Sequence, residues 1–129
     1  MTTINLMDLF GIPQAKLKGK PTHEYFEKYK HRLDIMLACA QAEADNYWQQ
    51  PLGRRVCAAP ASFLRVAILA RKDKKYDVEV AACELWYSII YDYKAQDVDW
   101  AMVDKGPTSK AILARLPKAR ELRNKARDK

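Results

Sequence analysis

The glycines and prolines of this chain stand in a few clusters, and long stretches without either residue lie between them. The chain has four glycines and six prolines in 129 residues. One stretch free of both runs over residues 22–50, and another runs over residues 61–105. Because glycine and proline are the strongest interrupters of regular structure, each stretch can hold long secondary-structure elements. The chain is therefore limited to a few long elements joined by short turns.

The composition favours helices for these elements. The sequence has 18 alanines and 12 leucines against 17 β-branched residues. Alanine and leucine lose little freedom on entering a helix, whereas β-branched residues lose more. Apolar residues make up 49% of the chain, which is too much for a disordered protein, and 129 residues suit one domain with its own core. We predict an all-α, single-domain bundle of five or six helices.

The first stretch predicts one continuous helix over residues 23–49. Thr22 precedes this helix, and Pro51 and Gly53 end it. Apolar residues recur along it at steps of three and four, which places them in one stripe. The stripe consists of Tyr25, Tyr29, Leu33, Met36, Ala40, Ala44 and Tyr47. It is broad enough for a second copy of the chain to complete it as a homodimer.

Two more strong helices are predicted in the middle of the chain. Pro60 suits the first turn of a helix that ends near Arg71, and Asp77 suits the N-cap of a helix over residues 78–93. The second of these is apolar almost all round, which is typical of a central helix. The centres of the two strongest stripes give the predicted core, namely Leu33, Met36, Leu85, Trp86 and Ile89.

Weaker elements are predicted towards the two ends of the chain. Asn5 can cap a short helix near the N-terminus, and another short helix is predicted around Trp100. Thr108 can cap the last helix, in which Pro117 either introduces a kink or starts a further helix. The chain thus divides into an N-terminal arm (1–21), a helical core (22–107) and a basic C-terminal segment (108–129).

Most of the net positive charge lies in that C-terminal segment. The chain has a net charge of +7, and residues 108–129 hold eight Lys or Arg against two acidic residues. The eight are Lys110, Arg115, Lys118, Arg120, Arg123, Lys125, Arg127 and Lys129. A local excess of cations indicates a site that meets an anion. Nucleic-acid phosphates, an acidic protein surface, or only solvent around a frayed chain end would each fit this pattern.

A second basic cluster joins the two middle helices. It consists of Arg71, Lys72, Lys74 and Lys75. Two helices around a turn invite comparison with a helix-turn-helix motif, but the second helix has no Arg, Asn or Gln to read bases in the major groove. We therefore expect this cluster to contribute contacts to phosphates, without sequence specificity.

Tyr87 and Tyr91 are the aromatic residues best placed to meet a partner. They lie one helical turn apart, beside Glu84 and Asp92. Aromatics mixed with Ile and Leu at helical spacing usually belong to a core, but these two can face outward as an interface patch. Aromatics in this segment could also stack on bases, as they do in single-strand binding proteins.

The sequence shows no motif for catalysis or metal binding. His23, Glu27, His31 and Asp34 fall at the spacing of ligands on a helix, but charged residues so spaced usually form a solvated outer face. With three serines and four glycines the chain has no nucleophile elbow and no phosphate-binding loop. We expect no metal, no cofactor and no enzymatic activity.

The cysteines and the hydropathy indicate a reduced cytoplasmic protein. Cys39, Cys57 and Cys83 stand in alanine-rich surroundings, which suits buried thiols better than disulfides or zinc ligands. The apolar runs fall well short of the roughly 20 residues that a membrane span needs, and residues 1–10 do not resemble a secretory signal. We expect no contact with a membrane.

These features predict a small non-enzymatic accessory or regulatory protein. In the leading interpretation it binds nucleic acid through backbone phosphates with its basic C-terminal segment. The alternative is a protein-interaction module, such as an inhibitor or assembly subunit of a larger nucleic-acid machine. Its basic tail would then meet an acidic surface, and its exposed aromatics would form the contact.

Overall fold

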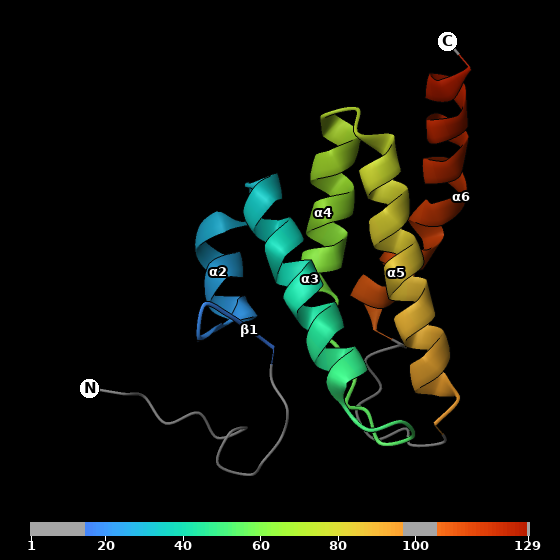
Figure 1. Ribbon diagram of the computed structural model, residues 1–129. Helices are drawn as coiled ribbons and strands as arrows, with labels where there is room; N and C mark the ends of the chain where they lie inside the picture. Colours follow the sequence, from blue (N-terminus) through green and yellow to red (C-terminus); the bar gives the residue numbers. More distant parts are fainter. Residues whose placement is uncertain (1–14, 97–105, 129) are drawn as a thin grey trace.

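Five helices and one small hairpin make up the part of the chain that the computed structural model describes, residues 15–96 and 106–128 (Figure 1). The helices are α2 (Thr22–Tyr29), α3 (Leu33–Gln49), α4 (Ala61–Lys72), α5 (Tyr76–Lys94) and α6 (Pro107–Arg127). Strands β1 (Lys16–Leu17) and β2 (Lys20–Pro21) pair antiparallel, with Lys16 opposite Pro21. The prediction of an all-α, single-domain bundle is confirmed.

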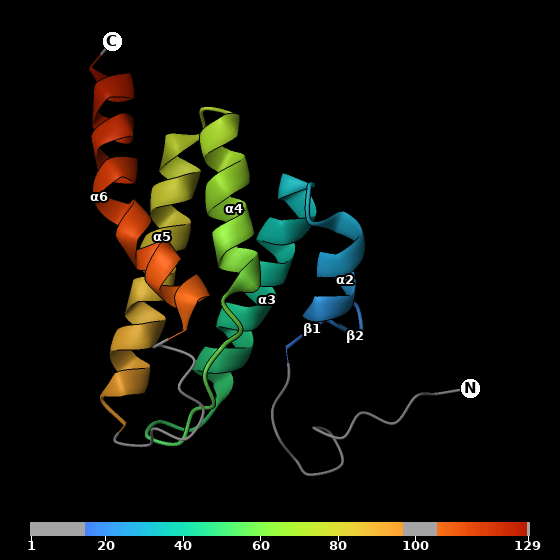
Figure 2. The ribbon, with the colours of Figure 1, turned by 180° about the vertical axis from the view of Figure 1, so that it is seen from behind.

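Helices α3, α4 and α5 lie side by side and alternate in direction (Figure 1). Helix α2 packs against α3 on the side away from α5. Helix α6 crosses the back of α4 and α5 and then continues beside α5 (Figure 2). The turns between helices therefore gather at the two ends of the bundle. Within the described residues, no helix combines the length and the apolar character needed to cross a membrane.

The core lies where α3, α4, α5 and α6 meet. Trp86 is fully buried at its centre, with its ring centroid 5.1 Å from that of Phe63. The indole Nε1–H of Trp86 donates a hydrogen bond of 2.9 Å to Ser109 Oγ on α6, so its one polar atom is satisfied. Among the predicted core residues Met36, Trp86 and Ile89 are fully buried, as expected.

Two predicted core residues are only half-buried. Leu33 lies in the first turn of α3, and Leu85 lines an apolar groove between α3, α4 and α5. Both residues pack against the edge of the core instead of its centre, and Leu85 is half-buried because the groove beside it is open to solvent. A helical stripe predicts which side of a helix turns inward, but the depth of burial depends on how closely its neighbours approach.

The predicted continuous helix over residues 23–49 is also wrong. The helix breaks between Tyr29 and Leu33, where Arg32 has an extended backbone with φ −104° and ψ 112°. The break lets α2 fold back along α3, and the rings of Tyr25 and Phe26 pack against the core. In a straight helix these rings would project into solvent beyond the bundle. The free energy gained by burying them is larger than the free energy lost when one turn of helix is broken. The break contains no glycine or proline, so the sequence has no local signal for it.

Helix α6 runs as one element through Pro117. The proline lacks the N–H that would bond the carbonyl four residues earlier, and the helix changes direction along its length (Figure 2). After Pro117 the apolar residues of α6 approach the surface, since Ala119 is buried, Leu122 is half-buried and Ala126 is exposed. A kink is therefore the correct one of the two predicted roles for Pro117.

Other local predictions need small corrections. Gly106 rather than Thr108 is the N-cap of α6, and Lys75 rather than Asp77 is the N-cap of α5. All three cysteines lie within the described residues and none is in a disulfide. Cys39 and Cys83 are buried as predicted, but Cys57 is partly exposed because it lies in the loop before α4. The predicted short helices near Asn5 and Trp100 lie outside the described residues.

Candidate functional site: the basic end of the bundle

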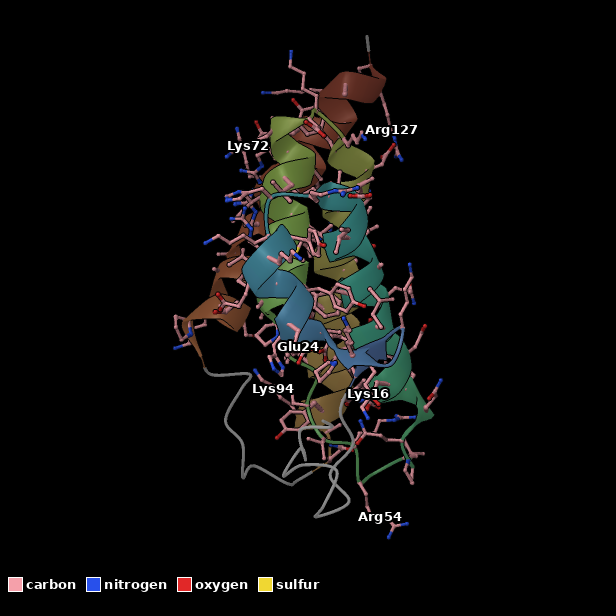
Figure 3. The ribbon with its side chains drawn as sticks, turned by 90° about the vertical axis from the view of Figure 1, so that its left-hand side faces the viewer. Lys16, Glu24, Arg54, Lys72, Lys94 and Arg127 are labelled. Carbon is pink, nitrogen blue, oxygen red and sulfur yellow. The ribbon has the colours of Figure 1, made fainter. Side chains whose placement is uncertain are left out.

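Three segments that are far apart in the sequence lie towards the same end of the bundle, the upper end in Figure 1. They are the turn between α2 and α3, the turn between α4 and α5, and the last turns of α6. Residues 30–34, 71–79 and 123–128 together hold nine Lys or Arg against five Asp or Glu. The alternating helix directions thus bring the two predicted basic clusters to the same end. Figure 3 shows Lys72 and Arg127 there, far from Arg54 at the opposite end.

A cavity of about 370 Å³ lies between the α4–α5 turn and the C-terminal turns of α6. Four of its lining residues are basic, namely Lys74, Lys75, Arg123 and Arg127. The other lining residues are Tyr76, Asp77, Val78 and Ala126. We call the six residues Lys72, Lys74, Lys75, Arg123, Lys125 and Arg127 the basic end. The cavity is its most concave part.

The backbone of the α4–α5 turn is fixed by a Schellman motif. The Lys75 N–H donates to the Ala70 carbonyl at 2.8 Å, and the Lys74 N–H donates to the Arg71 carbonyl at 3.0 Å. Lys74 has φ +58°, a left-handed conformation that helices usually give to glycine at this position. The turn thus holds two exposed lysines on a hydrogen-bonded backbone, and one of them stands where glycine would be less strained.

Two of the predicted contact residues have a structural role instead. Glu79 on α5 is fully buried, and Arg71 from α4 donates its Nε–H to Glu79 Oε1 at 2.9 Å. Arg115 from α6 donates its Nε–H to Glu79 Oε2 at 3.0 Å. The two guanidiniums satisfy a carboxylate that could not otherwise be buried. This Arg71–Glu79–Arg115 cluster joins three helices just below the basic end.

Several other cations of α6 form ion pairs on the surface. Arg127 Nη2 lies 2.9 Å from Asp77 Oδ1, and Arg120 Nε lies 3.6 Å from Glu84 Oε1. Lys118 and Lys125 both pair with Glu121, whose pKa is lowered by their hydrogen bonds. All of these side chains are close to half exposed or more, so the pairs contribute little to stability and the cations can move to another anion.

A few lysines keep their charge uncompensated. Among the lysines of the two predicted basic clusters that the structure describes, Lys72, Lys74, Lys75 and Lys110 form no ion pair, whereas Lys118 and Lys125 do. The first three belong to the basic end. Lys110 lies in the first turn of α6, about 26 Å from Arg127 along that helix at 1.5 Å per residue, and is not brought to the site. The structure therefore joins the α4–α5 turn to the end of α6 and leaves the start of α6 apart.

The two predicted interface tyrosines are on the surface of α5. Tyr87 is 53% exposed and Tyr91 is 71% exposed. Their ring centroids lie 6.4 Å apart, with 22° between the ring planes. They lie towards the C-terminal half of α5, whereas the basic end is at its N-terminus.

The residues with metal-ligand spacing do not share one helical face. The break after Tyr29 leaves His23 and Glu27 on α2, places His31 in the turn and puts Asp34 on α3. Asp34 accepts hydrogen bonds from Arg32, which lower the pKa of its carboxyl. In the described part of the chain, no three His, Cys, Asp or Glu side chains converge as metal ligands would.

Sequence reasoning missed two buried carboxylates, Glu43 and Glu79. Glu43 on α3 accepts a hydrogen bond from the Thr22 hydroxyl and one of 3.1 Å from the Ala59 N–H, and burial raises the pKa of its carboxyl. For Glu79, the spacing along the sequence did indicate a buried position. Glu79 precedes Cys83 by four residues and Trp86 by seven, so it shares their inward face.

No protein-family profile matches the chain, and neither a curated protein nor a solved structure is significantly similar to it. A function for this chain is therefore inferred from the geometry of its basic end.

Proposed function

We propose that this chain is a non-enzymatic accessory protein of the cytoplasm that binds nucleic acid through backbone phosphates at its basic end. The observation that carries the proposal is the cavity where Lys74 and Lys75 of one turn face Arg123 and Arg127 of a distant helix. These four cations outnumber Asp77, the one carboxylate that lines the cavity. A concave surface with such an excess of one sign of charge attracts the opposite charge. A phosphodiester backbone offers such anions in a regular row.

The conformation of Lys74 fits the same proposal because this residue also lines the cavity, whereas Lys18, which has a similar backbone, does not. A non-glycine residue in the left-handed region costs roughly 1–2 kcal/mol, and backbone strain of this kind is often found at functional sites. A lysine at this position places an exposed charge just beyond the end of α4. Glycine would make the turn easier to form but would remove that charge.

Salt dependence and a matched pair of charge reversals test the proposal. Binding of short nucleic-acid duplexes should weaken with salt, by about 0.9 in log affinity per decade of salt for each phosphate neutralised. The variant K74E/K75E should bind much more weakly than the wild type at every salt concentration. Its control is K18E/K20E in the hairpin, because Lys18 also has a left-handed backbone, with φ +52°, and both variants change the net charge equally. Equal affinities for the two variants would contradict the proposal.

An apolar groove favours a second function, the protein-interaction module. The groove has a volume of about 330 Å³ and lies between α3 and α5 over α4. Its walls include Leu37, Phe63, Val66, Val78, Ala82 and Leu85. Exposed apolar concavities of this kind suit a partner's side chains. If the protein binds no nucleic acid at low salt but a purified acidic protein binds it, and L37E removes that binding, the interaction module replaces the first proposal.

A further inference from the structure

A line of exposed residues on α5 connects the basic end to the two tyrosines. Asp77, Glu84 and Tyr91 follow one another at steps of seven residues, which is close to two helical turns. They therefore lie in one row, with Tyr87 beside it, and all four are exposed. From Asp77 to Tyr91 the row is about 21 Å long at 1.5 Å per residue.

Arginines of α6 stand along the first half of this row. Arg127 pairs with Asp77 and Arg120 pairs with Glu84, so two guanidiniums are held beside the row by contacts that cross from α6 to α5. The C-terminal half of α6 accompanies only the upper half of α5 in Figure 1. The row thus begins with two carboxylates that each have an arginine of α6 beside them, and it ends with aromatic rings.

The tyrosine rings contribute little to the fold where they are. Within the described residues neither hydroxyl forms a hydrogen bond, and the two rings contact each other at a small interplanar angle of 22°. With exposed fractions of 53% and 71%, both rings leave aromatic surface open to water. A planar, polarisable partner would cover that surface favourably, as nucleic-acid bases do.

We propose that this row binds single-stranded nucleic acid, with phosphates at the cations and unpaired bases stacked on Tyr87 and Tyr91. The inference rests on the function proposed above and adds a substrate class to it. A strand covers 21 Å with roughly six nucleotides at 3.4 Å each, or fewer when it is extended. A duplex keeps its base faces inside the stack, so only a single strand can use both parts of the row. Arg120 and Arg127 can then contact phosphates of the strand, because their exposed ion pairs with Glu84 and Asp77 are weak.

Three ligands and two variants of the full chain separate stacking from phosphate binding. The ligands are a single strand of about twelve nucleotides, within the range of known single-strand sites, an abasic strand with the same phosphates, and a duplex of the same length. The wild type should bind the single strand most tightly. The variant Y87A/Y91A should lose roughly 5- to 150-fold in affinity for that strand per stacked ring, with little change for the other two ligands. The variant Y87F/Y91F keeps both rings and should bind like the wild type.

The outcomes distinguish this inference from the function on which it rests. Equal binding of all three ligands, or equal losses in Y87A/Y91A for the single strand and the abasic strand, would overturn stacking and leave phosphate binding intact. If the wild type bound none of the ligands at low salt, both proposals would be wrong. A change in self-association in Y87A/Y91A without a change in nucleic-acid affinity would assign the tyrosines to a protein interface and also overturn the inference. Circular dichroism melts should coincide for all variants because both side chains are exposed.

Discussion

Arg71 and Lys72 are neighbours in the sequence, yet they belong to different kinds of site. Arg71 extends inward to the fully buried Glu79, which Arg115 also contacts. Lys72 extends into solvent at the basic end. The same charge therefore holds three helices together in one case and is available to a partner in the other. The difference arises from the side of α4 on which each residue lies and from the α5 carboxylate opposite Arg71.

The comparison shows that the net charge of a segment does not measure its capacity to bind anions. The C-terminal segment has eight basic residues, but Arg115 is committed to Glu79 and several others share surface carboxylates. The α4–α5 turn has fewer basic residues but more uncompensated lysines among the described residues. A binding surface is therefore better assigned from unpaired exposed charge than from sequence charge.

The largest loss of stability is expected from the variant E79A. Removing the carboxylate leaves the partly buried Arg71 and Arg115 without a counter-charge, which should cost about 3–5 kcal/mol of unfolding free energy. Urea unfolding followed by circular dichroism measures the loss. The control is E84A, which breaks an exposed pair and should cost less than about 1 kcal/mol. Similar losses in the two variants would remove the distinction between the buried cluster and the surface.

A smaller change in stability is expected from the variant K74G, which should be more stable than the wild type. Glycine relieves the left-handed strain but gains freedom in the unfolded chain, so the net stabilisation should be about 1 kcal/mol. Affinity for nucleic acid should fall in the same variant, because one cation of the cavity is lost. K18G should give a similar stabilisation without a loss of affinity. A destabilised K74G variant, or one that binds as the wild type does, would contradict this interpretation of Lys74.

The pH dependence of stability separates two kinds of buried carboxylate. Glu79 is compensated by arginines, whereas Glu43 is compensated by hydrogen bonds, and burial raises the pKa of Glu43 above its ordinary value of 4.5. As pH rises through the interval above 4.5, the unfolded chain loses this proton before the folded protein does. The folded state should therefore lose stability over that interval.

The variant E43Q checks this dependence. Its amide can still accept from the Ala59 N–H and donate to the Thr22 hydroxyl, but it does not ionise. The difference in unfolding free energy between the wild type and E43Q should shift in favour of E43Q as pH rises from 4.5. A difference that stays constant with pH would show that Glu43 has an ordinary pKa.

The smallest effect is expected from D77N at the basic end. The substitution frees Arg127 from an exposed pair, so unfolding free energy should change by less than about 1 kcal/mol. The local charge becomes more positive, and affinity for nucleic acid should increase modestly, most clearly at low salt. Titrations at two salt concentrations measure this. Weaker binding would indicate that Asp77 holds Arg127 in its productive position.

Most of the helical architecture could be read from the sequence. Breaker clusters and three-to-four spacing located α4, α5 and the kinked α6, and they identified Met36, Trp86 and Ile89 as core residues. These signals are local, since they depend on backbone freedom and on which face of a helix is apolar. The excess charge of residues 108–129 was equally visible, and so was the presence of the second basic cluster.

The tertiary structure alone decided the rest. Burial of Tyr25 and Phe26 broke the first helix at a place with no local signal, because the gain came from contacts with residues distant in the chain. The meeting of Lys74 and Lys75 with Arg123 and Arg127 depends on the directions of three helices, which no single segment encodes. The pairing of Arg71 and Arg115 with Glu79 is likewise a property of packed helices, since a buried charge must find its partner wherever the fold places one.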